Sequence, residues 1–73
     1  MASKRVKEFA EFVMSKMNYS DYTYELDDMR QRFGIKTLYS NRQIFFITYD
    51  AIDYSGFAVE REALERLRLG GYL

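Results

Sequence analysis

The sequence predicts an α+β fold in a single domain of residues 1–73: two N-terminal helices, a β-hairpin over about residues 36–60 and a short C-terminal helix. Two observations support this prediction. Apolar side chains recur at helical spacing through the first 33 residues, whereas residues 43–49 are rich in β-branched and aromatic side chains, which favour strands. No linker, repeat or low-complexity tract divides the chain, so we expect one domain.

The first helix is predicted over residues 3–17, because its apolar side chains recur at helical spacing and charged side chains occupy the other faces. The apolar face comprises Val6, Phe9, Ala10, Val13 and Met17. Ser3 precedes this run and can act as the N-cap. Phe12 falls outside the apolar face, so it is either a surface side chain packed at the flank of the helix or a contact residue for a partner.

A second helix is predicted to run to about Phe33, capped by Thr23 or Asp21 within the turn-forming residues 18–23. Its apolar face comprises Tyr22, Leu26, Met29 and Phe33. Two arginines near its end favour a helix C-terminus, and Gly34 is expected to terminate the helix in the left-handed conformation.

The predicted hairpin follows. Ser40 and Asn41 favour a turn, residues 43–49 a strand, residues 53–56 a second turn and residues 57–59 a returning strand. A buried helix is the alternative for part of this segment, because short apolar runs are ambiguous. That helix would bury Ile44, Ile47, Ala51 and Ile52.

The last helix is predicted over residues 60–69, with Ala63, Leu64 and Leu67 facing inward. Gly70 and Gly71 terminate it, and the two final side chains, Tyr72 and Leu73, are expected to dock back on the domain.

Composition limits the function. The sequence has no Cys and no His, so the commonest general base, the softest nucleophile and the usual transition-metal ligands are missing. We therefore expect no enzyme activity and no cofactor or metal. Eleven basic residues balance eleven acidic ones, which argues against strong binding to nucleic acid through phosphate neutralisation. The remaining prediction is a protein that binds another macromolecule.

Candidate contacts for that partner come from the aromatic residues. Three tyrosines, Tyr19, Tyr22 and Tyr24, crowd six positions at the predicted start of the second helix, more than one buried face can absorb. They either staple the first two helices together or anchor a partner. With Phe12 and Arg42 they form the predicted partner-binding set.

No apolar run approaches the length needed to cross a bilayer, and the first residues lead into an amphipathic segment, so we expect a cytoplasmic protein. Residues 26–35 resemble the first helix and turn of a helix-turn-helix, which leaves a DNA-binding regulator of helix-turn-helix or winged-helix type as an alternative. The resemblance is imperfect, because Arg30 stands where that motif has a small residue and Ser40 where it has an apolar one. A subunit that is stable only as an oligomer is a third possibility, since so short a chain has a thin stability margin.

Taken whole, the chain resembles a family of regulators. The runs Lys4-Arg5-Val6-Lys7-Glu8-Phe9, Asn18-Tyr19-Ser20-Asp21-Tyr22 and Gly70-Gly71-Tyr72-Leu73 are similar to small bacteriophage-encoded proteins that bind host bacterial RNA polymerase. The resemblance implies a non-catalytic protein in the host cell cytoplasm that acts on the polymerase β and β′ subunits. It further implies weaker engagement of the sigma factor, inhibition of initiation and promotion of antitermination.

Overall fold

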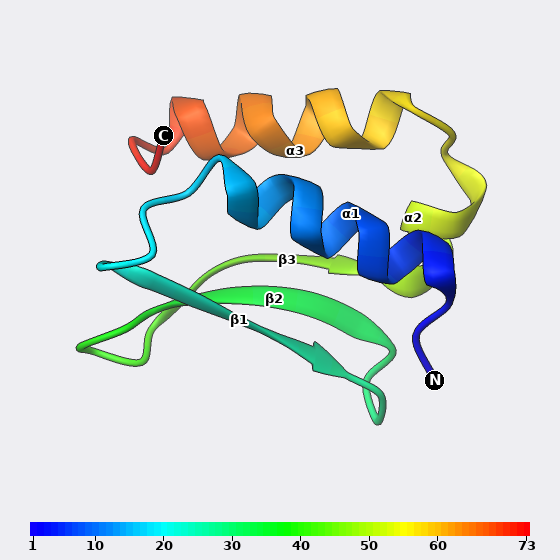
Figure 1. Ribbon diagram of the computed structural model, residues 1–73, viewed down its shortest axis with the longest axis horizontal. Helices are drawn as coiled ribbons and strands as arrows, with labels where there is room; N and C mark the ends of the chain where they lie inside the picture. Colours follow the sequence, from blue (N-terminus) through cyan, green and yellow to red (C-terminus); the bar gives the residue numbers. More distant parts are fainter.

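The computed structural model describes all 73 residues and confirms an α+β fold. In chain order its elements are α1 (Lys4–Ser15), β1 (Tyr22–Asp27), β2 (Arg32–Thr37), β3 (Gln43–Thr48), α2 (Tyr49–Tyr54) and α3 (Ala58–Leu69). The strands form one antiparallel sheet in the order β1-β2-β3. Helices α1 and α3 lie side by side over one face of this sheet, and no element covers the other face (Figure 1).

The first helix is confirmed with its cap and its apolar face. The Ser3 hydroxyl accepts a hydrogen bond from the Val6 N–H (3.1 Å), which satisfies one of the free donors at the helix start. The buried face of α1 packs with residues from the sheet and from α2 and α3 in one hydrophobic core. That core comprises Val6, Phe9, Ala10, Val13, Met14, Met17, Phe33, Ile35, Phe45, Tyr49, Ile52, Val59, Ala63 and Leu67.

The predicted second helix is wrong, because residues 22–37 form the hairpin of β1 and β2. Its apolar residues serve a sheet instead: Leu26 lies opposite Phe33 across the two strands, and Met29 is 95% exposed in the turn. The turn is closed by the Asp27 carboxylate, which accepts hydrogen bonds from two main-chain N–H groups, those of residues 29 and 30 (both 3.1 Å). Residues 26–35 therefore hold no helix-turn-helix.

Gly34 is not the helix terminator that the sequence suggested. It lies in the middle of β2 with Glu25 on one side and Phe46 on the other, and the glycines with positive φ are Gly56 and Gly71. The side-chain position of Gly34 points to the uncovered face of the sheet.

The predicted strand over residues 43–49 is confirmed as β3, which ends one residue earlier. The helical alternative is wrong for Ile44 and Ile47, which lie on β3, and holds for Ala51 and Ile52 on α2. The predicted returning strand over residues 57–59 is wrong, because α3 already begins at Ala58. The C-terminal helix is confirmed with its glycine ending. Gly71 has φ 84°, and the N–H of Tyr72 donates to the carbonyl of Leu67 (2.9 Å), as in a Schellman motif.

Tyr49 fixes the junction of β3 with α2. Its ring is buried, its hydroxyl donates to Asp28 Oδ1 (2.9 Å), and its main-chain N–H donates to the carbonyl of Gln31 (2.8 Å). Burial, followed by the hydrogen bond and the negative charge of Asp28, raises the pKa of Tyr49 to about 12. The tyrosine thus ties α2 to the turn between β1 and β2.

Replacing Gly34 by alanine is expected to stabilise the protein by about 0.5–1 kcal/mol, because glycine in a strand interior loses more conformational freedom on folding. An added Cβ would meet its nearest neighbours at 3.5 Å (Gln43 Oε1) and 3.7 Å (the Phe45 carbonyl), which is ordinary van der Waals contact. Thermal unfolding of the two proteins measures the change. A lower midpoint for Gly34→Ala would contradict this placement of the glycine.

In Tyr49→Phe, the free energy of unfolding is expected to fall less steeply with rising pH above about pH 10. An unfolded tyrosine ionises near about pH 10, whereas the folded side chain holds its proton to about pH 12. The stability contributed by the neutral hydroxyl is therefore complete below about pH 10 and is lost as the pH rises through about 12. Denaturation at several pH values and titration of the phenolate absorbance test this. A variant that keeps the late titration step would show that the step belongs to another tyrosine.

Candidate partner-binding surface

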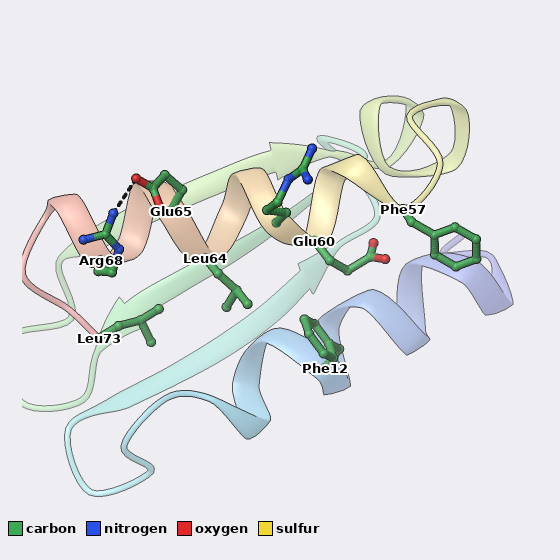
Figure 2. A pocket seen from close by; sticks show the side chains of 8 residues that line it. Phe12, Phe57, Glu60, Leu64, Glu65, Arg68 and Leu73 are labelled. Carbon is green, nitrogen blue, oxygen red and sulfur yellow. Dashed lines mark hydrogen bonds and ion pairs between the residues drawn. The ribbon is translucent and has the colours of Figure 1, made fainter.

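A groove runs between α1 and α3 (Figure 2). It consists of two adjoining hollows, of about 370 Å³ and about 310 Å³, that share Phe12, Phe57 and Glu60. The larger hollow is also lined by Arg61, Leu64, Glu65, Arg68 and Leu73, and the smaller one by Arg5, Glu8 and Phe9. We call these residues together the α1–α3 groove.

Separate parts of the chain supply its apolar side chains. Phe12 lies one turn beyond the buried Phe9 on α1, rotated out of the core toward α3, and is 39% exposed. Phe57 directly precedes α3 and is 88% exposed, which is unusual for so large an apolar side chain. Leu64 comes from α3, and Leu73 from the chain end that the Schellman motif turns back. Figure 2 shows these four side chains following one another along the groove.

Charged groups border this apolar strip, and four of them form two ion pairs. The guanidinium of Arg5 lies 2.9 Å from Glu60 Oε1 and 5.9 Å from the centre of the Phe57 ring. Arg68 pairs with Glu65 one turn earlier on α3. An apolar strip with a charged border is the composition of a protein–protein contact surface, in which the apolar centre is desolvated and the border stays wet.

Of the five predicted contact residues, only Phe12 lies in the α1–α3 groove. Tyr19 and Arg42 are exposed in two loops at one end of the sheet. Those loops are joined, because the Leu38 N–H donates to the carbonyl of Asp21 (2.8 Å). Both residues therefore lie at the loop end of the molecule, outside the groove.

The tyrosine cluster does not mark the start of a helix, since Tyr22 and Tyr24 are both on β1 and Tyr19 precedes it. Alternate residues of a strand share a face, so both strand tyrosines point to the helix side. Tyr22 is half-buried with its ring edge-on to Tyr72 (centroids 6.0 Å apart). The Tyr24 ring packs against the Phe33 ring (centroids 5.8 Å apart), and Tyr24 is 41% exposed at the sheet edge. Tyr22 and Tyr24, two of the predicted contact residues, therefore pack at least partly within the domain.

Sequence reasoning missed Phe57, Leu64 and Leu73 as surface residues. The available signal for Phe57 was its position directly after Ser55 and Gly56, outside any periodic apolar face. Leu64 fits the inward face of a helix by spacing alone, and Leu73 reaches the groove because the chain reverses at Gly71.

No protein-family model matches the chain, and no curated protein or solved structure is significantly similar to it. Within the structure, no helix has both the length and the apolar character required to cross a bilayer. No group of three or more acidic side chains is arranged to hold a metal ion.

Truncating the two phenylalanines of α1 should separate core from surface. Phe9→Ala is expected to cost about 3–5 kcal/mol, as for other buried phenylalanines, because Phe9 is 1% exposed. Phe12→Ala is expected to cost about 1 kcal/mol or less, since its ring already contacts solvent. Urea denaturation measures both. Equal losses would place Phe12 in the core and remove it from the groove surface.

Proposed function

We propose that this protein is a non-catalytic regulator that binds bacterial RNA polymerase through the α1–α3 groove. The observation that carries a binding function is the exposed apolar strip of this groove, above all the Phe57 side chain held in solvent. The choice of RNA polymerase, and of its β and β′ subunits, rests on the whole-chain resemblance to phage regulators.

The groove has the physical properties that an anchor site needs. Phe12 and Phe57 present apolar surface whose removal from water favours association by about 25 cal/mol per Å², and they are aromatic, as many dominant contact residues are. Two ion pairs, Arg5–Glu60 and Arg68–Glu65, already lie in the rims. Glu8 and Arg61 are the charged lining residues outside these pairs. A partner that covers these two pairs therefore does not need to supply a counter-charge for them.

Occupancy of the polymerase by this protein would be enough to regulate transcription. If the protein and the sigma factor exclude each other on the polymerase, the apparent affinity for sigma falls as the protein saturates its site. Inhibition of sigma-dependent initiation requires no chemistry by this chain. Promotion of antitermination would require that the protein stay bound to the elongating enzyme, where the sigma factor has left.

The proposal is tested by measuring the affinity of purified bacterial RNA polymerase for Phe12→Ala and Phe57→Ala. Each is expected to weaken binding by about 2 kcal/mol, or about 30-fold in Kd, the size of a hot-spot truncation. Phe46→Ala is the control, because Phe46 (45% exposed) matches Phe12 (39%) in residue type and exposure and lies on the opposite, uncovered face of the sheet.

The outcomes distinguish the parts of the proposal. No affinity of the intact protein for RNA polymerase would refute the function. Phe46→Ala could instead weaken binding while Phe12→Ala and Phe57→Ala leave it unchanged. That result would place the contact on the uncovered face of the sheet and refute the groove as the binding site. Specific binding to DNA without polymerase would favour the DNA-binding alternative.

A further inference from the structure

We infer that the free edge of β1 is a docking site for an extended, basic segment of a partner polypeptide, which adds to the sheet as a fourth strand. The inference concerns a surface other than the α1–α3 groove. It does not depend on the partner being RNA polymerase.

The main chain of β1 offers unused hydrogen-bonding groups along this edge. The Leu38 N–H donates to the carbonyl of Asp21, which makes these two residues a hydrogen-bonded pair of the β1–β2 ladder. Hydrogen-bonded and non-hydrogen-bonded pairs alternate in an antiparallel ladder. In the observed register, Thr23 and Glu25 therefore bond to β2, whereas Tyr24 and Leu26 turn their N–H and C=O groups away from the sheet.

The edge is also open and regular. Strand β2 is the one helix or strand in extensive contact with β1, and the pairing runs through six residues without a shift. The opposite edge differs, since Ile35 pairs with Phe45 and Lys36 with Gln43, which leaves Ile44 as an extra residue in β3. Bulges of this kind protect sheet edges against further pairing, and β1 has neither a bulge nor a proline.

Side-chain charge indicates what kind of strand would pair there. Residues 17–29 contain four acidic and no basic residues. On the uncovered face, β1 presents Glu25 and Asp27, while on the helix side it presents Tyr24 and Leu26. A strand with basic side chains on one face and apolar ones on the other complements both.

A second copy of this chain is a poorer occupant. Pairing β1 with the same strand of another molecule would bring Glu25 and Asp27 of both copies onto one face without a cation from either strand. Like charges on neighbouring strands are destabilising. Lys36 pairs with Glu25 (3.2 Å) and Arg30 with Asp27 (3.1 Å) from within the chain. Both oxygens of Asp27 are engaged, so Glu25, whose side chain is 51% exposed, is the carboxylate that a basic strand can reach.

The test uses the intact protein and a short synthetic peptide that alternates lysine and valine. Binding is measured by calorimetry, together with hydrogen exchange of the Tyr24 and Leu26 amides. Two control peptides replace lysine by glutamate or methylate alternate main-chain nitrogens. We expect the lysine peptide to bind at least about tenfold more tightly than either control and to slow exchange at both amides.

Charge variants of the protein test the same contact. Glu25→Lys should weaken binding of the lysine peptide and strengthen binding of the glutamate peptide. Glu62→Lys, which makes the same charge change at an exposed position of α3, should alter neither. The inference is overturned by equal binding of the methylated peptide, by equal effects of the two variants, or by self-association through β1 in place of peptide binding. A failure to bind RNA polymerase with the peptide results intact would refute the proposed function and leave this inference standing.

Discussion

The packing of Phe33 is the contact on which the rest of the structure depends. This fully buried ring, in the central strand β2, contacts the rings of Phe9 on α1 (5.6 Å), Tyr24 on β1 (5.8 Å) and Phe45 on β3 (6.4 Å). One side chain thus joins the first helix to all three strands. The sequence has no cysteine for a disulfide, so apolar and aromatic burial of this kind supplies the main cohesion of the domain.

The position of α1 over Phe33 also decides what remains at the surface. With Phe9 directed at the sheet, Phe12 lies at the side of the helix and faces α3 instead of the core. The Schellman ending of α3 then returns the chain end, so that Tyr72 packs on Tyr22 of β1 and Leu73 lines the groove. The contacts that pack the helices on the sheet therefore also fix the position of the apolar strip. The strip is formed before a partner binds, so binding does not have to order it.

The fold could be predicted where the spacing of apolar residues fits a helix or a strand but not both. Helices α1 and α3 carry unbroken helical spacing and recognisable ends, at Ser3 and at Gly71. The β1–β2 hairpin could not be predicted in the same way, because Tyr22 and Leu26 are four residues apart, a spacing that places two side chains on one face of a helix and of a strand alike. The hairpin is set by features other than periodicity: Leu26 lies opposite Phe33 across the two strands, and the Asp27 carboxylate closes the turn between them.

The candidate site was predictable to the same limited extent. Phe12 could be recognised because it departs from the apolar face of its own helix, a property of local sequence. The arrangement of Phe57, Leu64 and Leu73 beside it depends on how α3 crosses α1 and on where the chain reverses. Tyr24 was predicted at the start of a helix and lies instead within the edge strand β1. There it contributes outward-facing main-chain groups as well as a ring.

The two proposed contact surfaces are consistent with each other because the molecule is small. Its principal extents are 30, 25 and 16 Å, so the surface of one large partner is wide enough to contact α3 and the edge of β1 together. Two weak contacts on a rigid body combine strongly, since forming the first removes most of the translational cost of the second. A partner that engages both the apolar strip and the free strand edge therefore binds more tightly than either contact alone would allow. Rigidity is the condition for this gain, and the packing around Phe33 provides it.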